Sequence, residues 1–170
     1  MMSQISTDSN DVKGMQVSKV LVGGLSKTEL QEQLHGSGIL LNDYAYMLLN
    51  DCGFTVSNAR REVVVVTYTP FELGLYFGAT YQEIVQKAEL KGYKVCTLEL
   101  AVYLRLQYTE QLEGVHLCVS ANPINRDISF PKGLYLRKVN NTLWLRGYRA
   151  SDDFVFPPSA MFVFEQTDKT

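Results

Sequence analysis

The chain has 170 residues, which is the length of roughly one domain. Its hydrophobic fraction of 46% and charged fraction of 20% are those of a globular protein, and they exclude wholesale disorder, a collagen-like repeat and a coiled coil. The net charge of −2 gives no overall field that would attract nucleic acid or an anionic membrane, so any anion site must be local.

The cysteines and the first residues indicate a cellular compartment. The three cysteines are an odd number without a CxxC motif, which favours reduced thiols in a cytoplasmic protein over a disulfide framework. Residues 1–14 contain no apolar segment typical of a signal peptide, and no apolar run reaches about 18 residues. We therefore expect a cytoplasmic chain with no membrane segment, with a disordered tail over residues 1–14 and a single domain over residues 15–170.

The first half of the chain predicts mainly helices. Residues 17–22 are β-branched and predict a strand, and residues 63–66 are four valines that predict a strand covered on both faces. Four helices are expected over residues 27–36, 43–51, 81–91 and 98–107. The second is apolar on nearly every side, so we expect it to be buried. Each expected helix follows a residue whose side chain caps helices well: Ser26, Asn42, Thr80 and Thr97.

The second half changes to a pattern of period two, which is typical of strands. Strands are predicted over residues 115–120 and 161–164, and a hairpin over residues 134–148 turns at Asn140 and Asn141, which tolerate a positive φ. This order predicts an α+β fold. Its helices lie mostly in residues 26–107 and pack on one face of a largely antiparallel sheet, built mainly from the C-terminal half.

The hairpin carries the main candidate binding site. With a two-residue turn, Arg137 opposes Trp144 and Tyr135 opposes Arg146 on one face of the sheet, while four leucines occupy the other. A guanidinium beside an aromatic ring can hold a carboxylate, a phosphate or a base. The alternative is a solvated face on which each cross-strand pair contributes only about 0.2–1 kcal/mol to the hairpin. Both interpretations stay open.

Arg105 is a fifth candidate ligand-binding residue. It lies between two leucines of an apolar helix, so its stem is expected against the core and its charge must be paired. The sequence allows either a ligand or a structural ion pair. The carboxylates considered as partners are Glu72, Glu83, Glu99 and Glu110.

Catalytic, metal and nucleic-acid sites have weaker support. Cys96 precedes a helix start, where a thiolate is favoured, and His116 could act as its base. A small hydrolase or transferase that uses Cys96 or His116, with Arg105 as anion holder, is therefore the alternative function. The two histidines are far apart, and no metal-ligand or phosphate-loop motif occurs, so we expect no catalytic residue, metal or cofactor. Acidic residues flank the hairpin, which makes nucleic acid an unfavourable partner: Asp127, Asp152, Asp153 and Glu165.

Four blocks of the sequence resemble a family of uncharacterised bacterial proteins in which they recur in the same order. The blocks are GGLSKTELQEQL, GILLNDYAYMLL, FELGLYFGATYQEIVQKAELKGYKVC and LELAVYLRLQY. The resemblance covers residues 20–164 and implies a bacterial, cytoplasmic origin, but no activity, ligand or catalytic residue. Family members often have proline after the cysteine before the last helix, where this chain has Thr97.

Together these patterns predict a non-catalytic binding or interaction module. Its partner is expected to be a protein or a small anionic ligand, held at Tyr135, Arg137, Trp144 and Arg146 together with Arg105. The oligomeric state is left open.

Overall fold

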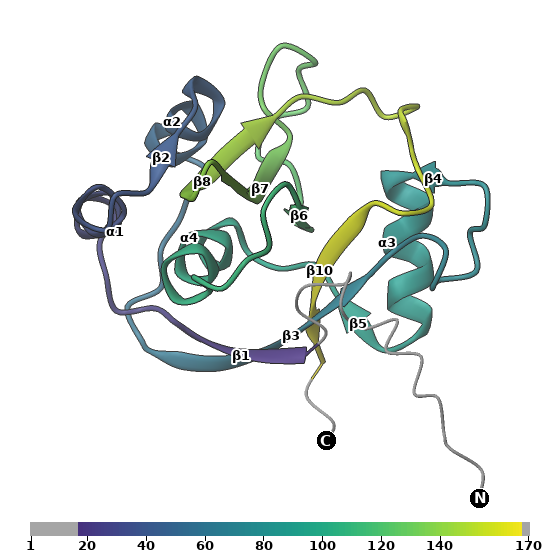
Figure 1. Cartoon of the computed structure of the whole chain (residues 1–170), viewed down its shortest axis with the longest axis horizontal. Coiled ribbons are helices and arrows are strands. Elements are labelled where there is room, and N and C mark those ends of the chain that lie inside the picture. Colours follow the sequence, from purple (N-terminus) through teal and green to yellow (C-terminus); the bar gives the residue numbers. More distant parts are fainter. Residues whose placement is uncertain (1–16, 168–170) are drawn as a thin grey trace, which may run out of the picture.

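The computed structural model describes residues 17–167 (Figure 1), and the tail predicted over residues 1–14 lies outside them. Within this range eight strands form one sheet, in which most neighbours are antiparallel. This confirms the predicted α+β fold. In spatial order the sheet contains β1 (Val17–Val22), β3 (Arg61–Tyr68), β10 (Met161–Gln166), β6 (His116–Val119), β7 (Gly133–Val139), β8 (Thr142–Tyr148) and β2 (Leu40–Leu41), with β5 (Tyr93–Lys94) beside β10. A separate small sheet pairs β4 (Ala79–Thr80) with β9 (Val155–Phe156).

The four helices begin where the capping residues predicted. The side chain of each capping residue accepts a hydrogen bond from the backbone N–H three residues later, and two of the helices have a complete capping box. Such a cap stabilises a helix by about 1 kcal/mol because it satisfies a backbone donor that the helix leaves free. The helices are α1 (Lys27–Gly36), α2 (Asp43–Asn50), α3 (Tyr81–Leu90) and α4 (Leu98–Gln107).

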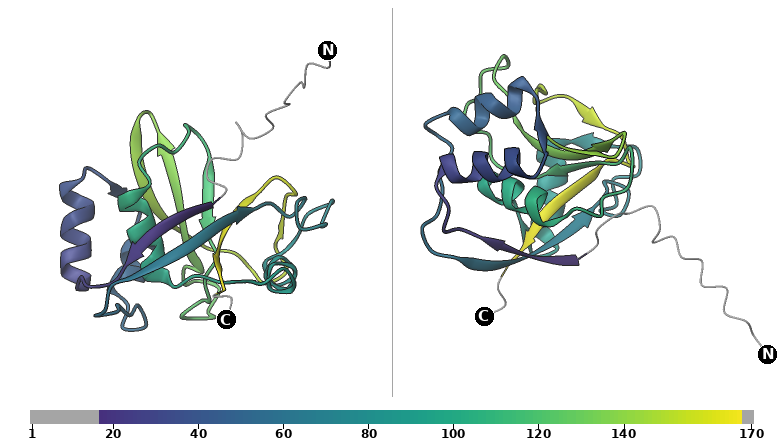
Figure 2. Two further views of the ribbon diagram at one scale, coloured as in Figure 1. Left: turned by 90° about the horizontal axis from the view of Figure 1, so that it is seen from below. Right: turned by 60° about the vertical axis from the view of Figure 1, so that its left-hand side comes forward.

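The helices cover both faces of the sheet, so the prediction of a single helical face was wrong. Helices α1, α2 and α4 lie on one side, and α3 lies on the other beside β10 (Figures 1 and 2). The cause is the alternation along β10: Val163 is buried in the first core, whereas Phe162 and Phe164 are buried in a second core. The apolar stripe of α3, which includes Ile84 and Ala88, covers those two phenylalanines.

Helix α2 is only partly buried, which corrects a second prediction. Its inner side buries Ala45, Leu48 and Leu49, but Tyr46 and Met47 are 45% and 42% exposed. The helix packs beside β8 at the edge of the sheet, and in the described residues no element covers its outer side. The sequence of α2 is apolar on nearly every side, but only the inner side of the helix is buried.

The hairpin has the predicted turn and register. Asn140 and Asn141 have φ values of 49° and 62°, and β7 pairs with β8 so that Val139 lies opposite Thr142. Positive φ at both central residues is the geometry of the two-residue turn that matches the twist of the strands. The Glu113 carboxylate accepts hydrogen bonds from the backbone N–H groups of both asparagines, which fixes the tip of the hairpin.

Candidate functional site

One face of β6, β7 and β8 gathers the chemically active side chains of the hairpin. His116, Arg137 and Trp144 lie opposite one another across the three strands, which confirms the predicted pairing of Arg137 with Trp144. Most side chains on the other face of these strands are buried in the first core, as Leu117, Leu136 and Leu145 are. Sequence reasoning considered His116 only as a catalytic base and missed its place beside the hairpin. We call the following side chains the outer face: His116, Cys118, Tyr135, Arg137, Trp144 and Arg146.

Aromatic contacts order the outer face. The Arg146 guanidinium carbon lies 4.1 Å from the centroid of the Trp144 ring, a distance at which a cation is attracted to the face of the ring. The rings of His116 and Tyr135 are stacked, with centroids 5.3 Å apart and an interplanar angle of 6°. The first contact lies along β8, and the second joins β6 to β7. Together they fix the positions of these side chains on the outer face.

The two arginines of the outer face carry uncompensated positive charge. Among residues 17–167, neither Arg137 nor Arg146 has an acidic partner within 4.0 Å or a hydrogen-bond acceptor. The Nε atom of each guanidinium is also buried without an acceptor, and such a donor is costly to leave unsatisfied. An anion placed here would offset the repulsion between the two cations and accept hydrogen bonds from the guanidinium N–H groups that solvent can reach, since both side chains are partly exposed.

A cavity of about 440 Å³ lies next to the outer face. Its walls are mainly aromatic: Phe156 lies 4.9 Å from Phe154 and 5.1 Å from Phe162, measured between ring centroids. Sequence reasoning missed this cavity, although the aromatic run before the last strand was a signal for it. The lining residues are His116, Cys118, Tyr135, Tyr148, Phe154, Phe156, Pro157, Ala160, Met161 and Phe162.

Neither of the thiols in the interior is placed to act as a nucleophile. Burial raises the pKa of Cys118 to about 12 and that of Cys96 well above its ordinary value, so both thiols are protonated at neutral pH. Cys96 lies in the first core, whereas His116 lies on the outer face. The structure therefore does not bring together the Cys96 and His116 pair considered from the sequence.

Arg105 is fully buried behind the outer face rather than on it. Its guanidinium donates to the Gln111 side-chain oxygen at 2.6 Å, to the Tyr108 carbonyl, and to the Trp144 carbonyl at 3.4 Å. These acceptors are neutral, so the expected ion pair with a glutamate was wrong for the described residues. Burial lowers the pKa of Arg105 to about 10, which still leaves it charged at neutral pH. Arg105 thus supports Trp144 from the core side.

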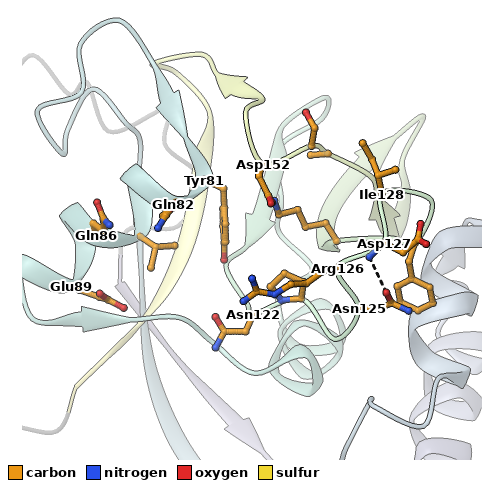
Figure 3. Close-up of a pocket in the computed structure, with 16 residues that line it drawn as sticks. Tyr81, Gln82, Gln86, Glu89, Asn122, Asn125, Arg126, Asp127, Ile128 and Asp152 are labelled. Atoms are coloured by element: carbon orange, nitrogen blue, oxygen red, sulfur yellow. Dashed lines mark hydrogen bonds and ion pairs between the residues drawn. The ribbon is translucent and has the colours of Figure 1, made fainter.

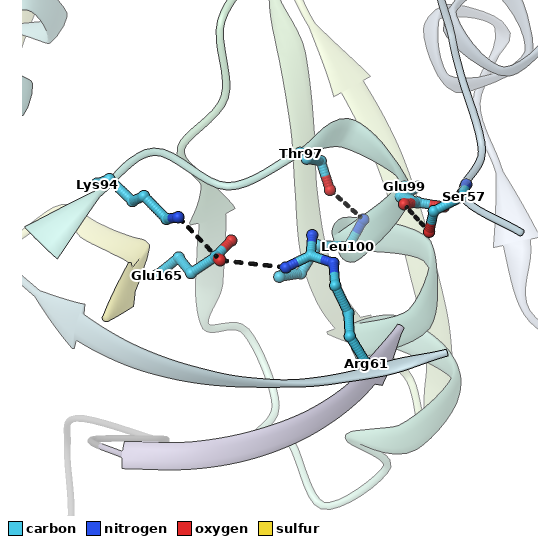
Figure 4. Close-up of polar contacts among 7 residues, drawn as sticks. All are labelled: Ser57, Arg61, Lys94, Thr97, Glu99, Leu100 and Glu165. Carbon is cyan, nitrogen blue, oxygen red and sulfur yellow. Dashed lines mark hydrogen bonds and ion pairs between the residues drawn. The ribbon is translucent and has the colours of Figure 1, made fainter. Parts of the chain in front are cut away.

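Two buried carboxylates form structural contacts (Figure 4). Glu165 lies 3.2 Å from Arg61 Nη1 and 3.5 Å from Lys94 Nζ, so it joins β3, β5 and β10. Glu99 accepts hydrogen bonds from the backbone N–H and the hydroxyl of Ser57 at 3.0 and 2.6 Å. Both carboxylates thus have partners within the fold.

A polar pocket of about 510 Å³ lies between α3 and the loop over residues 121–132 (Figure 3). Lys132 lies against the Tyr81 ring and donates to Asp152 at 2.9 Å, while Asp127 accepts from Ser129. Charges of both signs are mixed here and several are already paired. The pocket therefore lacks the single sign of charge that distinguishes the outer face.

The remaining classes of site have no support in the described part of the chain. Residues 17–167 contain no group of three or more His, Cys, Asp or Glu side chains placed to hold a metal ion. None of the helices in this range has the length and apolar sequence needed to cross a bilayer. Comparison with models of protein families found no match, and no curated protein or solved structure matched the chain.

The positive charge of the outer face affects the pKa of His116, which can be measured. Loss of water around its ring, and then the charges of Arg137 and Arg146, lower the pKa of His116 below the ordinary 6.5. The folded chain therefore binds this proton more weakly than the unfolded chain does. The contribution of His116 to stability is present above pH 6.5 and is lost as the pH falls from there through the lowered pKa.

We expect the Arg137→Gln variant to raise the pKa of His116 toward its ordinary value, because one nearby cation is removed. NMR of the imidazole ring protons during a pH titration measures this, with His35→Gln present throughout so that one histidine remains. Lys138→Gln is the matched control, since alternation along β7 directs Lys138 to the other face. An equal change of the pKa in both variants would contradict the assignment.

Proposed function

We propose that this chain is a non-catalytic binding module that holds a small anion on the outer face. The observation that carries the proposal is the pair of guanidiniums, Arg137 and Arg146, which lie beside the only tryptophan and have no acidic partner in the described residues. A guanidinium presents several N–H donors in one plane and can bind two oxygens of an anion at once.

The hydrolase or transferase alternative has less support. Nucleophilic catalysis needs a nucleophile within hydrogen-bond reach of a base, and an anion holder beside both. Cys96 and Arg105 are buried on the helical side of β6 to β8, whereas His116 faces the other way. The candidate catalytic groups are thus separated by the sheet.

A protein partner is the second candidate, and exposed aromatic side chains favour it. Phe71, Tyr76 and Phe77 are 58%, 60% and 96% exposed on the segment that leads into β4. Apolar side chains gathered at a surface are typical of contact sites for proteins. Such a partner would lose affinity in a Phe77→Ser variant and keep it in an Arg137→Gln variant.

The cellular setting belongs to the same proposal. Cys52, Cys96 and Cys118 are all free thiols, which supports a reducing compartment. Together with the resemblance of the sequence blocks, this favours the cytoplasm of a bacterium.

Tryptophan fluorescence tests the proposed anion site, because Trp144 is the only tryptophan. Titration with inorganic phosphate and with acetate is expected to change the emission of Trp144 in a saturable way. Arg137→Gln and Arg146→Gln should each weaken binding about tenfold, as the loss of a charged hydrogen bond does, while Lys138→Gln leaves it unchanged. Equal responses from all three variants would exclude a specific anion site on the outer face.

A further inference from the structure

We propose that the anion bound by this chain is an aromatic acid, whose ring enters the cavity beside the outer face while its carboxylate binds to Arg137 and Arg146. This inference rests on the proposed anion-binding function and adds the class of ligand. Three properties of the described residues support it: an apolar cavity, the pairing of two of its lining residues with the two arginines in the sheet, and the sign of the charge at its rim.

The cavity is suited to an aromatic ring. Its volume of about 440 Å³ lies within the range of roughly 300–1,000 Å³ that is common for small-molecule sites. Phe156 meets Phe154 and Phe162 at interplanar angles of 77° and 86°, so both ring faces and ring edges line the space. A further ring can therefore join this cluster in the offset or edge-to-face contacts that aromatic groups prefer.

Two of the polar groups in the cavity wall, on Cys118 and Tyr148, are already paired with each other. The Cys118 thiol donates to the Tyr148 hydroxyl oxygen at 3.4 Å, so these two groups already contact each other. Burial raises the pKa of Tyr148 well above its ordinary value, which keeps the hydroxyl neutral. An apolar ring can occupy the cavity without leaving a charged group unsolvated.

The cavity and the cations share a border. His116 and Tyr135 line the cavity, and they are the residues that lie opposite Arg137 and Arg146 in the register of the sheet. Opposite residues of antiparallel strands have Cα atoms only about 4.5–5.5 Å apart. Arg137 and Arg146 do not line the cavity themselves, so the carboxylate of the ligand must extend from its ring past His116 and Tyr135 to meet them.

The charge at the rim selects an anion over a cation or a neutral molecule. None of the residues that line the cavity is acidic. A ligand amine would be repelled by the two guanidiniums, and an uncharged ring would leave their positive charge without a partner. Four residues on the connection that runs from β8 to β10 (Figure 1) line one side of the cavity, namely Phe154, Phe156, Pro157 and Ala160. The volume of the cavity suits a small molecule.

Isothermal titration calorimetry with three probes tests the inference. The probes are 2-naphthoate, acetate, which lacks the ring, and 2-naphthylmethanol, which lacks the charge. We expect 2-naphthoate to bind at least about tenfold more tightly than either of the others, because only this probe uses both parts of the site.

Variants assign each end of the ligand to its part of the site. Ala160→Leu places additional methyl groups in the cavity wall and should weaken 2-naphthoate about tenfold while leaving acetate unchanged. Ser159→Leu is the matched control, because the side chain of Ser159, the residue next to Ala160, is exposed and does not line the cavity. Phe154→Ser is a second cavity variant that is expected to fold, since Phe154 is 48% exposed. Circular dichroism checks each fold.

The outcomes separate this inference from the proposed function. If acetate binds as tightly as 2-naphthoate and the cavity variants change nothing, the aromatic ligand is wrong while the anion site stands. If 2-naphthylmethanol binds as tightly as 2-naphthoate, and Arg137→Gln and Arg146→Gln have no effect, the anion site itself is wrong. If no probe binds, both proposals fail.

Discussion

Replacing Arg105 with methionine is expected to lower the free energy of unfolding by about 3 kcal/mol, the upper end of the cost of leaving a buried hydrogen-bonding group without its partner. Methionine fills much of the volume of the arginine stem but donates no hydrogen bond. The oxygens that now accept from Arg105, on Gln111, Tyr108 and Trp144, would then lose a donor in the interior. Urea unfolding followed by circular dichroism measures the loss.

Two further variants test the cause of this loss. Arg105→Lys keeps the charge, but a single ammonium cannot reproduce the planar fork, so most of the loss should remain. Arg60→Met is the surface control, since Arg60 is exposed, and its effect should stay within about 0.5 kcal/mol. If Arg105→Met unfolded at the same urea concentration as Arg60→Met, the buried network would have no part in stability.

Gln111 extends the network of Arg105 into the sheet. Its side-chain amide donates to the carbonyls of Val115 and Leu136 at 3.0 and 2.9 Å while its oxygen accepts from Arg105. The helix α4 is thereby tied to β7, and through the Trp144 carbonyl to β8. The residue that was predicted to bind a ligand instead sets the position of the strands that carry the outer face.

Local interactions explain which parts of the fold the sequence predicted. The cap at Ser26 depends on Glu29, three residues away, and the turn at Asn140 and Asn141 depends on their tolerance of positive φ. The register of Arg137 with Trp144 then follows from counting residues on either side of the turn. These features depend only on residues that are close together in the sequence, and the structure confirms them.

The parts that were missed depend on contacts between distant segments. Strand β10, from the end of the chain, lies between β3 and β6, and this order brings Phe162 beside Cys118. The cavity arises from that placement, so the aromatic run before the last strand could not locate it by itself. The neutral partner of Arg105 was missed for a related reason, because the search for partners considered only carboxylates and passed over Gln111.

Gly147 determines how closely α2 approaches β8. This contact is the basis of the second prediction of a large loss of stability. A Cβ atom at Gly147 would lie 2.6 Å from the Tyr44 carbonyl carbon and 2.8 Å from the Ala45 backbone nitrogen. Both are backbone atoms, so no side chain can rotate away to make room. The Asn42 side chain also exchanges two hydrogen bonds with the Gly147 backbone, at 2.8 and 2.9 Å, while it caps α2.

Gly147→Ala is therefore expected to lower the free energy of unfolding by about 3 kcal/mol, because it overpacks the contact and strains the hydrogen bonds of Asn42. Thermal unfolding followed by circular dichroism measures this loss. Gly36→Ala is the control: a Cβ atom there meets nothing within 4 Å, and alanine in a helix stabilises slightly. Equal melting temperatures for the two variants would mean that α2 can move away from β8 freely. Gly147 lies directly between Arg146 and Tyr148 in β8. If α2 could move away, this part of β8 would lose a rigid support, and the binding geometry of the outer face depends on that support.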